Sequence, residues 1–348
     1  MRIGILGCGT ISDIYLQNLT TRLEGITVTA CSDIYEAAAR LAAEKWHVKA
    51  MVPNELLHSP EVDCVLLLTP PTTHYELGMQ ILSCGKHLYT EKPLALTAAQ
   101  ARVLLNTAAE RGLRVGCAPD TFLGAGLQTV FSAIDRGMIG KPLAASAFML
   151  CGGHEAWHPN PAFYYQPGGG PLMDMGPYAL TALVKIFGPG EEVCAMGMRA
   201  AQEREIATGP RQGQQFPVLV DTFLSAQVRF ACGAVATLIY SFDTAPTVLP
   251  NLEIYGQLGT ILAPDPNWFG GPVRLGDKAT GTWSELPLLA GRPTENIRGI
   301  GVWEMSLAIQ EGRPHQADGE TGFHVVSIIE AILRSAAEGK PCRIAEMQ

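Results

Sequence analysis

Short apolar runs alternate with longer amphipathic or Ala-rich stretches over the first 120 residues. The pattern predicts strands at 2–6, 26–32, 64–68, 87–90 and 114–117, separated by helices at 12–22, 35–45, 75–83 and 97–111. The run at 64–68 is apolar at every position, as in a parallel strand buried on both faces. This alternation predicts an α/β fold that begins with a doubly wound parallel sheet.

The rhythm changes after residue 120. Helices are expected at 127–136, 175–187, 302–311 and 322–338. Strands at 222–230 and 234–242 flank a turn at Ala231-Cys232-Gly233, and 252–255 and 259–262 form a similar pair, so both indicate antiparallel hairpins. The second half therefore predicts an α+β domain, an antiparallel sheet with helices on one side. We expect two domains, 1–120 and 121–348.

Composition narrows the classes of partner and compartment. The 348 residues carry a net charge of −8, which provides no basic footprint for nucleic acid. The nine cysteines are scattered without a C-x-x-C pair, a pattern typical of free thiols in a reducing compartment. No signal peptide is evident, and no apolar stretch approaches the roughly 20 residues that span a bilayer. A soluble, cytoplasmic protein without membrane or nucleic-acid partners is expected.

A glycine motif directly follows the first strand and reads Gly7-Cys8-Gly9-Thr10-Ile11-Ser12. Glycines there allow a tight turn and the close approach of a pyrophosphate, which the unpaired N–H groups of the next helix can bind. Ser12 stands where the strict Rossmann fingerprint has Gly or Ala, and the same glycines also suit a plain strand-to-helix turn.

An acidic residue ends the second strand. Asp33 stands about where a carboxylate accepts hydrogen bonds from the adenosine ribose hydroxyls. No Arg or Lys follows directly, since the next residues are Ile34, Tyr35 and Glu36, so nothing obvious would hold a 2′-phosphate. NAD is therefore favoured over NADP, although Asp33 as a solvated turn residue stays open.

A lysine follows the fourth long strand, in Glu91-Lys92-Pro93. Ligands of open α/β sheets bind at the carboxyl ends of the strands, which would bring Lys92 into the cofactor crevice. Its ammonium could hydrogen-bond a substrate hydroxyl and stabilise negative charge as that group becomes a carbonyl. By position alone, Lys92 is equally compatible with ordinary surface charge.

A second glycine run, 168–170, leads into the apolar helix predicted at 175–187. Asp174 lies in the first helical turn, and Tyr178 follows four residues later on the same helix face. A phenol beside a lysine ammonium has a lowered pKa and can shuttle a proton. The alternative is that Asp174 caps the helix and Tyr178 packs in the core.

Together these motifs resemble the Gfo/Idh/MocA oxidoreductases, named partly for glucose–fructose oxidoreductase and inositol dehydrogenase. The matching features are Gly7-x-Gly9, Thr69-Pro70-Pro71-x-x-His74, Glu91-Lys92-Pro93 and 168–178. The resemblance implies a Rossmann domain and a second domain on a large open antiparallel sheet that commonly mediates oligomerisation, so a homodimer or homotetramer is expected. It also implies hydride transfer on a hydroxyl of a sugar, polyol or related ring.

The resemblance also implies roles for individual residues. Lys92 would be the catalytic lysine and Asp174 a substrate-site residue. The cofactor would be lined by Gly7, Gly9, Thr10, Ile11, Ser12, Asp33, Thr69, Pro70, His74, Glu91 and Lys92. Tyr178 replaces the His of many members and resembles the glucose–fructose oxidoreductase and dihydrodiol dehydrogenase branch, where it would exchange the proton. The segment 119–122 lacks the usual Asn/Arg sequence, so sugar specificity does not transfer.

The segment His154-Glu155-Ala156-Trp157-His158 fits the H-E-x-x-H pattern of zinc proteases literally. That chemistry needs both histidines on one helix face. Gly152-Gly153 before the segment and Pro159-Asn160-Pro161 after it disfavour such a helix, so no metal is expected. A loop over the substrate pocket, in which Trp157 and His158 contact a sugar-like ring, is the favoured interpretation, and simple loop packing stays open.

The combined hypothesis is reversible hydride transfer between C4 of nicotinamide and a carbinol carbon of a carbohydrate-like substrate. Tyr178 would exchange the hydroxyl proton, Lys92 would polarise the oxygen, and Asp174 would orient Lys92 or bind a second hydroxyl. Two alternatives are a redox-neutral enzyme that modifies glycosides through tightly held NAD, and a regulator that binds a dinucleotide without turnover.

Overall fold

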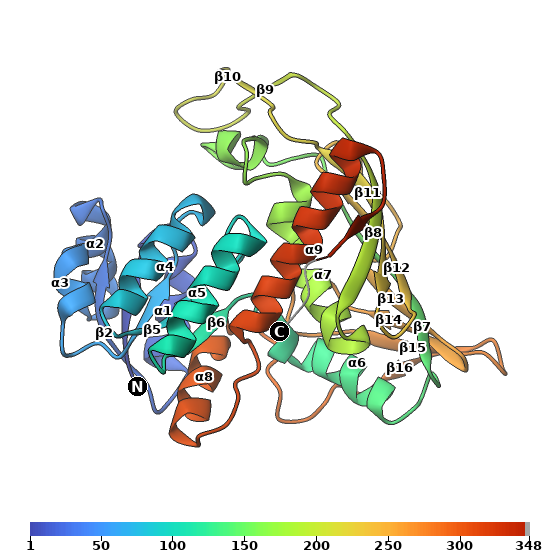
Figure 1. Cartoon of the computed structure of the whole chain (residues 1–348), viewed down its shortest axis with the longest axis horizontal. Helices are drawn as coiled ribbons and strands as arrows, with labels where there is room; N and C mark the ends of the chain where they lie inside the picture. Colours follow the sequence, from blue (N-terminus) through green and yellow to red (C-terminus); the bar gives the residue numbers. More distant parts are fainter. Residues whose placement is uncertain (345–348) are drawn as a thin grey trace. The chain divides into compact units, whose positions relative to one another are not determined.

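The computed structural model describes residues 1–344 and divides into two compact units. The first unit consists of Met1–Leu123 and Glu295–Val326. The second consists of Gly124–Thr294 and residues 327–344. Figure 1 follows the elements along the chain.

Six parallel strands form the sheet of the first unit, in the order β3-β2-β1-β4-β5-β6. The strands are β1 (Arg2–Leu6), β2 (Thr27–Ser32), β3 (Lys49–Ala50), β4 (Cys64–Leu67), β5 (His87–Thr90) and β6 (Val115–Cys117). The helices are α1 (Ser12–Thr21), α2 (Glu36–Trp46), α3 (Pro53–His58), α4 (His74–Ser83), α5 (Ala98–Glu110) and α8 (Ile300–Gln310), with 3-10 turns η1 (Pro71–Thr73) and η2 (Thr121–Leu123). The predicted doubly wound parallel sheet is confirmed, while β3 and α3 were not predicted.

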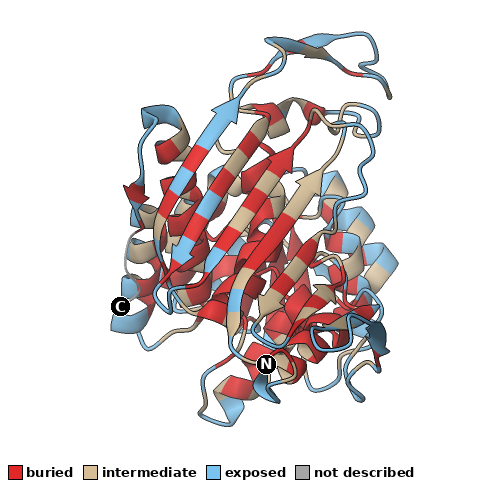
Figure 2. Ribbon diagram, turned by 90° about the vertical axis from the view of Figure 1, so that its right-hand side faces the viewer, coloured by how far each residue is buried: buried red, intermediate tan, exposed pale blue. Residues whose placement is uncertain are grey.

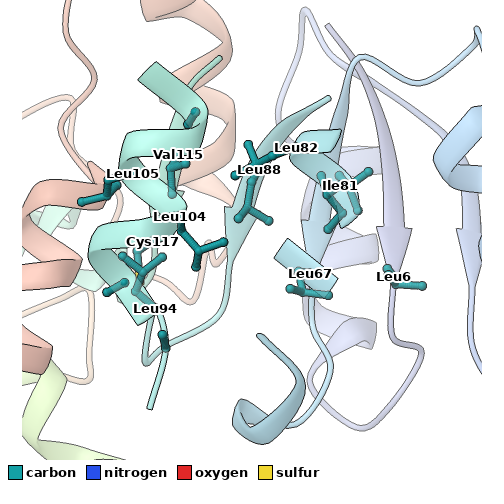
Figure 3. Close-up of a cluster of buried hydrophobic side chains, with 14 of the residues drawn as sticks. Leu6, Leu67, Ile81, Leu82, Leu88, Leu94, Leu104, Leu105, Val115 and Cys117 are labelled. Carbon is teal, nitrogen blue, oxygen red and sulfur yellow. The ribbon is translucent and has the colours of Figure 1, made fainter. Parts of the chain in front are cut away.

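Leucine and valine side chains bury one face of this sheet. Leu6 of β1, Leu67 of β4 and Leu88 of β5 lie in a cluster with residues of α3, α4 and α5. Figure 3 shows Ile81 and Leu104, from α4 and α5, packed beside these strands. All four residues of β4 are buried, so its continuous apolar run reflects burial on both faces of the sheet.

The segment 295–326 packs in the first unit although it follows the second domain in sequence. The buried carboxylate of Asp120 accepts hydrogen bonds from the N–H groups of Gly299 (2.8 Å) and Gly301 (3.0 Å) at the start of α8. The Asn18 side chain donates to the carbonyls of Asn296 and Arg298. The first compact unit therefore includes 295–326, whereas the predicted division at residue 120 assigned this segment to the second domain. The buried hydrogen bonds join the distant segments.

The second unit contains a mixed, mainly antiparallel sheet of nine strands, in the order β16-β15-β14-β13-β7-β12-β11-β8-β17. These are β7 (Pro142–Leu150), β8 (Gly190–Met198), β11 (Phe223–Phe230), β12 (Val235–Ser241), β13 (Leu252–Gly256), β14 (Gly259–Ala263), β15 (Val273–Asp277), β16 (Trp283–Leu286) and β17 (Cys342–Arg343). Only the β7–β12 pair is parallel among the pairings in the described sheet. The predicted α+β domain and both predicted hairpins are confirmed.

Helices cover one face of the nine-stranded sheet. They are α6 (Ala125–Asp135), α7 (Pro171–Phe187) and the later part of α9 (Gly319–Glu338). A separate two-stranded hairpin pairs β9 (Glu203–Glu205) with β10 (Gln215–Pro217), beside the 3-10 turn η3 (Pro161–Tyr165). Figure 2 shows the opposite face, on which exposed and buried positions alternate along the strands. The helix predicted at 175–187 begins earlier, at Pro171, because proline is favoured in a first helical turn. Within residues 1–344, no helix is both long and apolar enough to cross a membrane.

Asp120 makes the stability of the fold depend on pH. Burial raises the pKa of its carboxyl from 3.8 to about 6, although the N–H groups of Gly301 and Gly299 act in the opposite direction. Between about pH 4 and pH 6.5 the Asp120 carboxyl keeps its proton in the folded protein but loses it in the unfolded chain. The free energy of unfolding therefore decreases by up to about 3 kcal/mol as the pH rises through this window. Asp120→Asn does not titrate. We predict that the unfolding free energy of the wild type, relative to this variant, falls across that window in urea titrations.

Asp135→Asn, at an exposed position of α6, controls for the loss of one charge. A difference between wild type and Asp120→Asn that stays constant with pH would show that Asp120 is not the titrating group.

Candidate functional site

Four strands of the first unit end in one row. Leu6 of β1 pairs with Ser32 of β2 and with Leu67 of β4, and Leu67 pairs with Thr90 of β5. The residues that follow this row leave the sheet at its carboxyl edge, where open α/β sheets bind their ligands. The predicted residues Gly7, Asp33, Thr69 and Lys92 all lie just beyond it.

The glycine loop between β1 and α1 has the geometry of a phosphate-binding turn. Gly7 has a φ of +107°, and a Cβ there would lie 2.7 Å from the carbonyl carbon of Leu68. Gly9 is exposed, and a Cβ there would meet no atom within 4 Å among the described residues. Thr10 and Ile11 are exposed as well. Gly7 is thus required by the fold, and Gly9 leaves open space in front of the backbone.

The start of α1 offers hydrogen-bond donors. No side chain of the described residues caps this helix. The hydroxyl of Ser12 instead donates to the Gly9 carbonyl at 2.7 Å, which tightens the loop. Free N–H groups and the helix dipole attract an anion at a helix N-terminus, so the turn fits a dinucleotide pyrophosphate.

Asp33 holds the glycine loop from the end of β2. Its Oδ2 accepts from the N–H of Cys8 at 2.8 Å, and its Oδ1 accepts from the N–H of Tyr35 at 2.8 Å. A carboxylate has about four acceptor sites, so both bonds leave capacity for ribose hydroxyls. Ile34 and Tyr35 are 82% and 72% exposed and offer no cation to a 2′-phosphate.

His74 joins two turns of the site. The ring is buried, with Nδ1 2.7 Å from the Pro93 carbonyl and Nε2 2.8 Å from the Thr69 carbonyl. Burial lowers the pKa of His74, whereas the hydrogen bonds to the Pro93 and Thr69 carbonyls act in the opposite direction. Exposed Pro70 belongs to the same turn. His74 therefore connects the turn after β4 to the backbone that directly follows Lys92.

Glu91 orients the backbone of the predicted catalytic lysine. Its Oε2 accepts from the N–H of Lys92 at 2.9 Å, and its Oε1 accepts from the hydroxyl of Tyr15 at 2.7 Å. Tyr15 is fully buried in α1, where burial and then the charge of Glu91 raise its pKa. Tyr15 was not predicted, because a tyrosine in an amphipathic helix has no signal that separates it from the core.

In the second unit, the glycine run sets the start of α7. Gly170 has a φ of +94°, and its N–H donates to the Tyr164 carbonyl at 2.6 Å. A Cβ at Gly169 would lie 2.6 Å from the same carbonyl oxygen, so the run permits close contact with η3. Asp174 and Tyr178 then follow on one face of α7, both largely buried.

An aromatic cluster surrounds His154. We use this name for His154, Trp157, His158, Phe163, Tyr164 and Phe242. The ring centroids of contacting pairs in this cluster are 4.0 to 6.4 Å apart. His154 Nε2 lies 3.0 Å from Asp174 Oδ2. The structure thus joins the predicted residues Trp157 and His158 to Asp174 through His154, which was not predicted as a site residue.

The segment 154–158 forms a turn, not a helix, as its glycine and proline flanks predicted. The N–H of His158 donates to the His154 carbonyl at 2.9 Å, and His158 Nδ1 accepts from the N–H of Asn160. Burial and the neighbouring His154 lower the pKa of His158. In residues 1–344, no three His, Cys, Asp or Glu side chains gather in a group that could hold a metal ion.

Family models match both halves of the chain. Residues 1–118 match the oxidoreductase family with an NAD-binding Rossmann fold, and residues 127–262 match the GFO/IDH/MocA C-terminal domain. The chain belongs to the Gfo/Idh/MocA family. The predicted family membership, oxidoreductase class and NAD-binding fold are therefore confirmed, whereas the site residues and the branch of the family stay predictions.

Named relatives match most of the chain. Myo-inositol 2-dehydrogenase of Thermotoga maritima is 28% identical over 272 residues, covering 76% of this chain and 75% of that protein. The 1,5-anhydro-D-fructose reductase of Ensifer adhaerens is 25% identical over 361 residues, covering 99% and 98%. An NAD binding oxidoreductase from Klebsiella pneumoniae has a similar structure, with a TM-score of 0.86, 21% identity and 99% of both chains covered.

The glycine loop allows a sharp test of the cofactor site. Gly7→Ala places a Cβ against the Leu68 backbone and strains a left-handed φ, so the loop must move. We predict a loss of NAD affinity of about tenfold or more, measured by calorimetry, since a shift of this loop would remove the expected hydrogen bonds to the pyrophosphate. Gly25→Ala is the matched control, because Gly25 has a φ of +82° but open space around it. Equal NAD affinity in both variants would count against the loop.

Proposed function

We propose that this chain transfers a hydride between nicotinamide and a hydroxyl-bearing carbon of a sugar, polyol or glycoside. The observation that carries the proposal is the row in which β2, β1, β4 and β5 end, with Asp33, Gly7, Thr69 and Lys92 just beyond it. The named activities of the relatives, on inositol and anhydrofructose, support a sugar-like substrate. The cofactor supplies the hydride acceptor or donor.

Lys92 and Tyr178 are assigned the proton and charge chemistry. Lys92 follows β5 and would hydrogen-bond the reacting oxygen, stabilising its negative charge. Tyr178, one turn after Asp174 on α7, would exchange the hydroxyl proton. Asp174 would accept a hydrogen bond from a second hydroxyl or orient Lys92. Trp157, which is 59% exposed, and His158 would contact the ring of the substrate.

NAD is proposed as the working cofactor in preference to NADP. Asp33 carries a negative charge at the end of β2, where the 2′-phosphate of NADP would lie. Repulsion between two anions, with no neighbouring cation, disfavours NADP there.

The nine free thiols, of which Cys194 and Cys232 are exposed, support a reducing compartment and thus a cytoplasmic location.

The first experiment tests the reaction and its lysine. Purified protein is incubated with sugars, polyols and glycosides in the presence of NAD or NADP, and the absorbance of the reduced cofactor is followed. We predict turnover with NAD and a loss of at least about 10³-fold in kcat for Lys92→Ala, with NAD binding nearly unchanged. Lys141→Ala, at an exposed position directly before β7, is the control. Full activity of Lys92→Ala would refute the assignment.

We also propose that the open face of the nine-stranded sheet forms a homodimer or homotetramer. Met196 and Met198 of β8 are 78% and 53% exposed, and Val235 of β12 is 38% exposed. Apolar side chains of this size on an uncovered sheet face favour burial against another surface. A second copy of the chain, related by a two-fold axis, would cover this surface with the same residues.

Charges on this face should break the assembly. We predict that Met196→Glu combined with Met198→Glu yields monomers in light scattering, because two carboxylates would be desolvated in the interface. Leu41→Glu, which alters a 69% exposed leucine on α2, should leave the mass of the assembly unchanged. An unaltered assembly in the double variant, or a monomeric wild type, would exclude this sheet face as the interface.

A further inference from the structure

A carboxylate–imidazole pair lies at the start of α7. His154 Nε2 and Asp174 Oδ2 are 3.0 Å apart, and their side chains are only 12% and 17% exposed. A carboxylate oxygen accepts hydrogen bonds, so the ring nitrogen Nε2 carries the proton and donates it. This fixes the tautomer of a neutral His154 and one oxygen of Asp174.

Aromatic rings hold the imidazole in place. The centroids of Tyr164 and Phe242 lie 4.2 Å and 4.5 Å from the His154 ring, and that of Trp157 lies at 5.2 Å. The N–H of His154 also donates to the Tyr165 hydroxyl at 3.2 Å. Ring and backbone are therefore both fixed, so the direction of the Nε2–H bond is set before any substrate binds.

A network of charged side chains secures the turn that carries His154. The hydroxyl of Tyr165 donates a hydrogen bond to Glu155, and Arg204 of β9 forms ion pairs with both Glu155 and Asp243. Burial and the bond to Glu155 raise the pKa of Tyr165, so it stays protonated and able to donate. Arg204 also donates to the carbonyls of Gly152 and Phe242, at 3.3 Å and 3.0 Å.

The backbone passes so close to this network that only glycine fits at 153. Gly153 has a φ of +96°, and a Cβ there would lie 2.5 Å from both Glu155 Oε2 and the Tyr165 hydroxyl. Gly153 thus has a second role besides disfavouring a helix. It lets the turn lie against the charged residues that place His154.

We propose that His154 is a positioning residue for Asp174 and a determinant of substrate specificity. This inference rests on the proposed function, in which Asp174 lies in the substrate site. With one oxygen bound by His154, the carboxylate keeps a fixed orientation and accepts a hydrogen bond from a second substrate hydroxyl. The site therefore selects polyols and sugars with a hydroxyl next to the reacting carbinol over deoxy analogues, which cannot donate this hydrogen bond.

Two substitutions separate the N–H donor from the aromatic ring. His154→Phe keeps a ring among Tyr164 and Phe242 but has no donor. His154→Gln loses the ring but places an amide N–H close to the position of Nε2. The measurement is kcat/KM for a polyol substrate and for its analogue that lacks the neighbouring hydroxyl. His58→Gln, at an exposed position of α3, is the matched control.

The wild type, His58→Gln and His154→Gln should prefer the polyol over the deoxy analogue by about tenfold or more. His154→Phe should lose most of this preference, through a higher KM for the polyol and little change for the analogue. Equal preference in His154→Phe and the wild type would overturn the proposal. An equal loss in both His154 variants would do so too, because the ring and not the donor would then matter.

A second readout separates this inference from the proposed function. In protein labelled with ¹⁵N-histidine, the Nε2 proton of His154 should give a protected NMR signal that disappears in Asp174→Ala. If that signal behaves so but no polyol or sugar is turned over, the proposed function fails while the pair stands. If the signal is the same in both proteins, the pair itself is refuted, whatever the activity.

Discussion

The pairing register of four parallel strands is the constraint on which the first unit depends. Neighbouring strands β2, β1, β4 and β5 are paired through Ser32, Leu6, Leu67 and Thr90. All four strands therefore end at the same level of the sheet. A slip by one residue would turn the buried side chains of a strand to the opposite face. The same register that the core enforces therefore brings a glycine turn, a carboxylate and a lysine to one edge, and those groups suit a dinucleotide and the oxygen of an alcohol.

The residues behind these groups keep them rigid. Asp33 binds the glycine loop, His74 connects the turn after β4 to the backbone that follows Lys92, and Glu91 connects the lysine backbone to Tyr15. The second unit uses the same principle, since buried charged and aromatic side chains fix the turn that carries His154. Such contacts limit the motion of the loops and side chains that would bind ligand.

Sequence patterns predicted the elements with strong periodicity and those marked by glycine. The two hairpins, the doubly wound sheet and the helix that carries Asp174 followed from them, but β7 did not, because Ala-rich 142–150 lacks strand propensity. Packing of 295–326 in the first unit depends on Asp120, whose partners lie about 180 residues away and leave no local signal. Nothing in the segment 154–158 separated His154 from His158. Their difference arises from the tertiary contact of His154 with Asp174 of α7.

The fate of the hydride tests the central claim most directly. A polyol that is turned over is prepared with deuterium on its carbinol carbon and incubated with NAD, and the released cofactor is analysed by mass spectrometry. The account predicts free NADH that carries the label at C4. Label that stays on protein-bound cofactor and returns to a product of unchanged oxidation state, or no labelled cofactor at all, would contradict it.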